Sequence, residues 1–96
     1  METFEVAHVR EQGVDLIITV VSPSFGHKSN SDQESATLAL QACAESAGLA
    51  GTVVPVWEES GGRLRFYAPT RWHSFFQSLD PLTLAASINR KLTCSF

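Results

Sequence analysis

Cysteine is scarce in this chain of 96 residues. The two cysteines, Cys43 and Cys94, lie far apart in the sequence and belong to no Cys-x-x-Cys pair. They therefore form neither a disulfide framework nor a zinc signature. We expect both to be reduced thiols, with Cys43 in the core, as is usual for a cytoplasmic protein.

Long apolar runs are also missing. The longest, Leu16 to Val21, is interrupted by Thr19 and is far shorter than the roughly 20 residues that a membrane helix needs. The segment from Met1 to Arg10 does not have the basic and then apolar regions of a secretory signal. We expect a cytoplasmic protein with no membrane partner.

A strong charge of either sign is absent, since the formal net charge is -3. This mild acidity argues against a general binder of nucleic acid. The charges are unevenly spread: residues 1–59 hold nine acidic and two basic residues, whereas residues 60–96 hold one acidic and five basic. We expect this asymmetry to serve internal or intersubunit pairing. The alternative is RNA binding by the C-terminal basic cluster, with Arg63, Arg65 and Tyr67 as a platform.

Two runs rich in Val, Ile and Phe, at 4–10 and 14–21, flank the segment Glu11-Gln12-Gly13. They predict a β-hairpin, with glycine supplying a positive φ. Placing Arg10 opposite Asp15 pairs opposite charges and is the register that we prefer.

A second hairpin is predicted from strands at 52–58 and 63–68, joined through a Gly-Gly turn. A two-residue loop would place Glu58 opposite Arg65, and a four-residue loop would place it opposite Arg63. Either loop puts a carboxylate beside an arginine. Both also give one face that carries Trp57, Leu64 and Phe66.

A loop from Ser22 to Asn30 separates the first hairpin from a predicted helix. The pattern Ser31-x-x-Glu34 has the form of a capping box, residues 32–47 show helical spacing of apolar residues, and Gly48 suits the C-terminal cap. We expect one long helix between the hairpins.

The C-terminal part predicts two short helices. The apolar residues between Trp72 and Leu79 have helical spacing, and Asp80-Pro81 is typical of a helix start. The second helix is assigned the stripe Leu84, Ile88 and Leu92, with Arg90 and Lys91 at its end. The order ββαββαα predicts one α/β (α+β) domain over residues 1–96, with a four-stranded, mostly antiparallel sheet packed with one long and two short helices.

Both faces of the predicted sheet are apolar, whereas a sheet with one wet face alternates between apolar and polar residues. Either helices cover both faces, or a second molecule covers one of them. We expect the latter, most simply through a homodimer, with Tyr67 as the anchor. The predicted interface residues are Val6, Ile17, Val54, Val56, Arg65 and Tyr67.

The loop before the long helix is the only segment with candidate ligand-binding residues, namely His27, Lys28 and Ser29. Loops that lead into helices suit anions, but this one lacks the phosphate-loop pattern. No nucleophile motif and no metal-ligand spacing are present, so we predict no catalytic residues, no metal and no cofactor.

The function predicted from the sequence is a small, cytosolic, non-catalytic interaction or assembly module of unknown pathway, acting as a homodimer or with a protein partner. The first alternative is a small-ligand-binding protein or minor enzyme that uses the 22–31 loop. The second is the RNA binder described above, although nucleic acid is not the partner that we expect.

Overall fold

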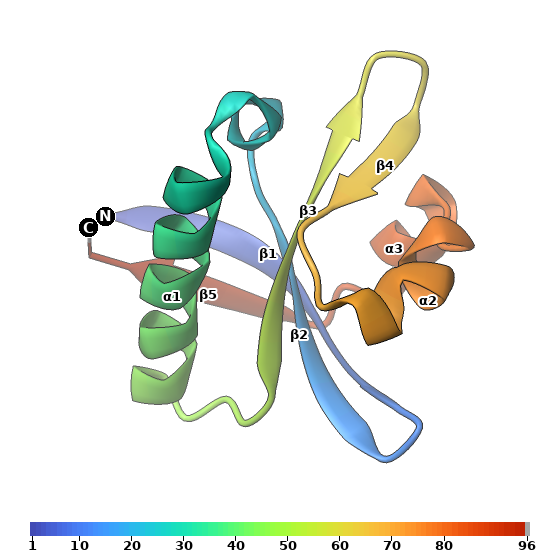
Figure 1. The fold of residues 1–96 in the computed structure, drawn as a ribbon. Coiled ribbons are helices and arrows are strands. Elements are labelled where there is room, and N and C mark those ends of the chain that lie inside the picture. The colour runs from blue at the N-terminus through green and yellow to red at the C-terminus, as the bar shows by residue number, and fades with distance from the viewer. Residues whose placement is uncertain (96) are drawn as a thin grey trace.

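The structure is a computed structural model that describes residues 1–95. Within this range five strands and three α-helices occur in the order β1 (Glu2–Glu11), β2 (Val14–Val20), α1 (Asn30–Ser46), β3 (Thr52–Glu59), β4 (Arg63–Phe66), α2 (His73–Gln77), α3 (Pro81–Ser87) and β5 (Arg90–Cys94). The 3₁₀ turns η1 (Pro23–His27) and η2 (Thr70–Trp72) precede α1 and α2. The strands form one sheet in the order β4-β3-β2-β1-β5 (Figure 1). The predicted α/β class is confirmed, and the sheet has a fifth strand that we did not expect.

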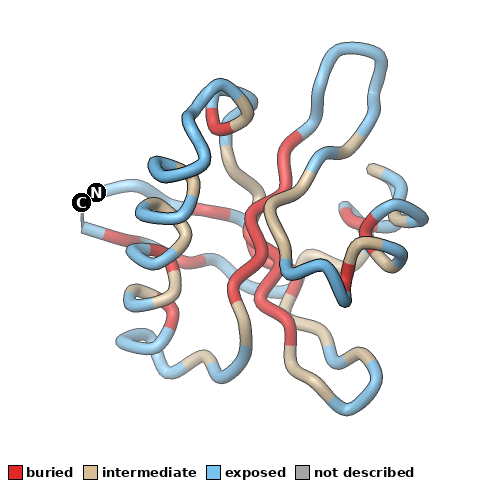
Figure 2. Tube along the Cα trace, in the orientation of Figure 1, coloured by how far each residue is buried: buried red, intermediate tan, exposed pale blue. Residues whose placement is uncertain are grey.

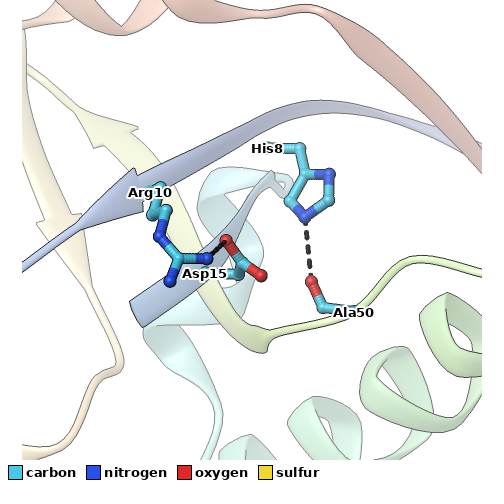
Figure 3. Close-up of polar contacts among 4 residues, drawn as sticks. All are labelled: His8, Arg10, Asp15 and Ala50. Atoms are coloured by element: carbon cyan, nitrogen blue, oxygen red, sulfur yellow. Dashed lines mark hydrogen bonds and ion pairs between the residues drawn. The ribbon is translucent and has the colours of Figure 1, made fainter. Parts of the chain in front are cut away.

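The first hairpin has the predicted register, with Arg10 opposite Asp15. The turn consists of Gln12 and Gly13, whose φ angles of 50° and 76° are those that a tight hairpin turn requires. Arg10 Nη1 lies 3.2 Å from Asp15 Oδ1 (Figure 3). The charge pattern therefore identified this pairing correctly.

The second hairpin differs from both predicted registers. Its loop has three residues, Ser60 to Gly62, so that Glu58 lies opposite Leu64, and Trp57 lies opposite Arg65. A one-residue change in loop length turns every side chain of a strand to the other face. As a result, Trp57 shares a face with Arg65 and not with Leu64, and Glu58 meets neither arginine.

Helix α1 begins slightly earlier than predicted and ends as predicted. Its N-cap is Ser29, whose Oγ accepts the Asp32 N–H at 3.2 Å. The capping box assigned to Ser31 is therefore wrong. At the other end Gly48 has a φ of 82°, and the Leu49 N–H bonds to Ala44 O at 2.9 Å, a common way to close a helix.

The last predicted helix is only partly correct. Asp80 caps α3 as expected, accepting the Thr83 N–H at 2.7 Å. The helix then stops at Ser87, and residues 90–94 form β5, which pairs antiparallel with β1. The physical reason is that β1 pairs with β2 only from Val6 onwards, so that the first residues of β1 would have no partner strand without β5.

The two cysteines are joined in a disulfide, which corrects the expectation of reduced thiols. The bond links Cys43 on α1 to Cys94 on β5, with the Cα atoms 5.9 Å apart. Alternation along β5 turns Leu92 and Cys94 to the same face, towards α1. This pairing depends on β5 being a strand, so the helix predicted for this segment did not indicate it.

Helices cover both faces of the sheet (Figure 1). Helix α1 closes one apolar cluster, and α2 with α3 closes the other. Buried residues run through the strands between these layers, while the outer sides of the helices and the hairpin tips are exposed (Figure 2). No helix among the described residues is long and apolar enough to span a membrane.

Candidate functional site

Four predicted interface residues lie in the interior. Val6, Ile17, Val54 and Val56 are at most 1% exposed. Val6 and Ile17 face α1, whereas Val54 and Val56 face α2 and α3, because β3 pairs with β2 so that Val54 lies beside Ile18 and Val56 beside Val20. The expectation of an open sheet face is therefore corrected. The chain's own helices cover these side chains.

The two remaining predicted interface residues, Arg65 and Tyr67, lie at the surface. Strand β4 is an edge of the sheet, and a groove of about 640 Å³ runs between it and α2. The groove is lined by Arg63, Leu64, Arg65, Phe66, Tyr67, Ala68, His73 and Gln77. Every residue of β4 therefore borders this groove.

The backbone of β4 is open on this side. The Tyr67 N–H donates to Pro55 O at 3.0 Å, across to β3. Because backbone groups alternate in direction along a strand, the N–H and C=O groups of Leu64 and Phe66 point away from β3. Proline has no N–H to donate to a neighbouring strand. Pro55 is tolerated in β3 because its nitrogen points to the side where β4 has already ended. The groove therefore contains an unpaired strand edge.

Tyr67 also borders a second hollow, of about 340 Å³, between α1 and the segment after β4. Its lining residues are Thr37, Leu38, Gln41, Thr52, Val53, Tyr67, Ala68 and Pro69. Leu38 is 62% exposed, which is unusual for a large apolar side chain. We call the β4 groove and this hollow together the Tyr67 surface.

Gln41 fixes one wall of the Tyr67 surface. Its side chain accepts the Val53 N–H at 2.8 Å and donates to Gly51 O at 2.9 Å. The sequence reasoning missed Leu38 as a surface residue. The available signal was its position outside the apolar stripe that runs through Leu40 on the same helix.

The basic residues of the C-terminal part do not gather in one place. Arg63 and Arg65 lie on β4, whereas Arg90 and Lys91 lie on β5 at the opposite edge of the sheet. Arg65 Nε is 4.0 Å from Glu59 Oε1, and both side chains are about half exposed, so this pair is weak. Arg63, Arg65 and Tyr67, the platform predicted for the RNA alternative, do line one groove, whereas Arg90 and Lys91 lie apart from it.

The 22–31 loop forms a hollow of about 310 Å³ against α1, and of the three predicted ligand-binding residues only Lys28 lines it. The lining residues are Glu2, Phe4, Val21, Ser22, Ser24, Phe25, Lys28, Ala36, Ala39 and Leu40. His27 is exposed outside the hollow, and the Ser29 hydroxyl caps α1. We call this the η1 hollow.

The other two histidines have structural roles. His8 Nε2 donates to Ala50 O at 2.8 Å (Figure 3), and His73 Nε2 donates to Ala68 O at 2.9 Å. A carbonyl oxygen only accepts, so both Nε2 atoms carry a proton. Across residues 1–95, no three His, Cys, Asp or Glu side chains are grouped to hold a metal ion.

Comparisons of the chain with family models, with curated proteins and with solved structures give no match. The candidate sites therefore rest on the geometry alone.

Proposed function

We propose that this protein is a non-catalytic interaction module whose Tyr67 surface binds an extended, acidic segment of another protein. The observation that carries the proposal is the unpaired edge of β4, which lies in a groove that the whole strand lines.

The backbone geometry favours an added strand. The outward N–H and C=O groups of Leu64 and Phe66 are what an extended peptide pairs with when it joins a sheet edge. Side-chain recognition would come from the neighbouring hollow, which Tyr67 and the exposed Leu38 both line. Tyrosine loses little rotamer entropy on binding, and tyrosine and arginine are enriched in interface hot spots.

The charges favour a foreign acidic segment over a second copy of this chain. If two β4 strands paired about a twofold axis, Arg63 and Arg65 of one copy would face those of the other, and like charges opposite each other destabilise a sheet. Short edge strands with basic side chains resist self-pairing for this reason. The homodimer expected from the sequence therefore becomes the alternative outcome of the test below.

The disulfide changes the proposed location. The cytoplasmic expectation relied in part on reduced thiols, whereas bonds such as Cys43–Cys94 persist in oxidising compartments. We therefore place the site of action in an oxidising environment. Thiol trapping in intact cells tests this, because a cytoplasmic protein would react as two free cysteines.

The binding proposal is tested by NMR titration with a short peptide of alternating valine and glutamate. We expect the largest shifts at the Leu64 and Phe66 amides. Arg65→Glu should abolish binding, whereas Arg90→Glu, the same charge change at the opposite edge, should leave it intact.

Two further measurements distinguish an acidic segment of another protein from a second copy of this chain. A matched valine–lysine peptide should not bind, and equal binding of both peptides would refute the acidic partner. Sedimentation should show a monomer. A dimer that dissociates on Tyr67→Ala would instead make a second copy the occupant.

A further inference from the structure

The geometry points to a second binding site, in which the η1 hollow holds a small monocarboxylate with an apolar body. This site is separate from the Tyr67 surface and does not depend on the function proposed for it. Its volume of about 310 Å³ is at the lower end of the roughly 300–1,000 Å³ that small-molecule sites occupy.

The floor of the η1 hollow is apolar. Phe4, Phe25 and Leu40 contribute to it and are each less than a tenth exposed. Ala36 and Ala39 line the wall formed by α1, where larger side chains would fill the space. An aliphatic chain or an aromatic ring therefore suits this floor.

The loop that forms the other wall is held in place. Gln33 Nε2 donates to Phe25 O at 3.1 Å, and the Phe25 ring lies 5.1 Å from the Trp57 ring. A Cβ added to Gly26 would lie 2.6 Å from Trp57 Nε1, so this close approach requires glycine. Since these contacts already fix the loop, a ligand would not have to order it.

The polar groups of the hollow suit an anion. Ser22 Oγ accepts both the N–H of Ser24, at 3.3 Å, and its O–H, at 3.1 Å. Its acceptor capacity is thus used, and its own O–H remains as a donor that these bonds polarise. Lys28 lines the same hollow and adds a positive charge.

The other charged residue of the hollow limits how much negative charge the ligand can carry. Glu2 also lines the η1 hollow, and its carboxylate opposes anions. One positive and one negative side chain tolerate a single negative charge better than two. We therefore assign a monocarboxylate and not a phosphate monoester.

The test is an NMR titration of the intact, oxidised protein with octanoate and with 3-phenylpropionate, which represent chain-like and ring-like ligands. We expect at least one of them to shift the amides of residues 22–28. Lys28→Gln should lower the affinity for that ligand by about 3–5-fold, the loss expected for an exposed ion pair. Lys91→Gln removes the other lysine and should have no effect.

Two more variants test the opposing charge and the free volume of the hollow. Glu2→Gln should tighten binding because it removes the opposing charge, and Ala39→Leu should block it by filling the hollow. Ala42→Leu, one turn along the same helix and outside the hollow, is the control for helix stability. The assignment is overturned if 1-octanol or octyl phosphate binds as well as octanoate, if Lys28→Gln and Lys91→Gln act alike, or if neither acid shifts these amides.

Discussion

The two helical layers of this protein are held to the sheet in different ways. On one side a single helix of 17 residues, α1, is fixed by the disulfide and by the side-chain hydrogen bonds of Gln41. On the other side are two helices of five and seven residues: α2 packs through aromatic rings, and α3 packs through Leu84. Helices this short are not stable alone, so their order depends on burial.

The difference shows how each layer compensates for what its sequence lacks. Helix α1 is rich in alanine and buries only Leu40 and Ala44 fully, so its apolar contact is small. The covalent bond and the polar contacts make up for this. The disulfide does not involve η2, α2 or α3, but each of these three buries a large side chain, namely Trp72, Phe76 and Leu84. Two changes of similar size should therefore disrupt the two layers separately.

The largest effect is expected from Phe76→Ala on the aromatic side. Phe76 is 2% exposed, and its ring contacts those of Phe66 and Phe75 at centroid distances of 5.4 Å and 5.0 Å. Its loss should reduce the free energy of unfolding by about 3–5 kcal/mol, the usual range for a buried phenylalanine. Chemical denaturation measures this, with Leu82→Ala, a change at an exposed leucine, as the control. Equal midpoints for the two variants would show that α2 is not packed as described.

The next effect is expected from removing the disulfide on the α1 side. The bond spans 51 positions, and the double variant Cys43→Ser with Cys94→Ser should lose about 2–4 kcal/mol. Hydrogen exchange should accelerate first in β5 and in residues 2–5 of β1, which pair only with β5, and not in α2. A reducing agent should have the same effect on the wild type and none on the double variant. Uniform acceleration across the chain would contradict the separation of the two layers.

The smallest effect concerns the start of α3. The Thr83 N–H holds the pKa of the Asp80 carboxyl below its ordinary value. A lowered folded-state pKa stabilises the protein at pH values above about 3.9, and this contribution is lost as the pH falls through the folded-state value. Asp80→Asn keeps a capping oxygen but does not titrate. The variant should therefore lose less stability than the wild type below about pH 4 in thermal unfolding, and identical pH profiles would exclude the cap as the cause.

The two hairpins differ in how well their strand registers could be predicted from charge. The register of β1 with β2, and so the face on which each side chain lies, was predicted correctly because the Arg10–Asp15 pair and a two-residue turn agree. The register of β3 with β4 was predicted wrongly because an arginine lies at both 63 and 65. A loop of two residues and a loop of four residues therefore both placed Glu58 opposite an arginine. The true three-residue loop pairs Glu58 with leucine instead. Apolar burial of Leu64 and Phe66 outweighed one exposed ion pair.

The candidate sites were predictable to different degrees. Lys28, Arg65 and Tyr67 were identified from the sequence and do line surface hollows. The floor of the η1 hollow was not predicted, because Phe4 comes from β1 and Leu40 from α1. Such a site exists only after the strands and the helix have packed together.

The sequence by itself determined the class of the fold, the first hairpin, the end of α1 and the cap of α3, since each depends on contacts between residues near one another in the chain. Only the tertiary structure decided that residues 90–94 form a strand and that Cys43 meets Cys94. The local spacing of Leu84, Ile88 and Leu92 favours a helix. The unpaired edge of β1 and the apolar surface of α1 favour a strand, and these long-range contacts outweigh a weak local preference.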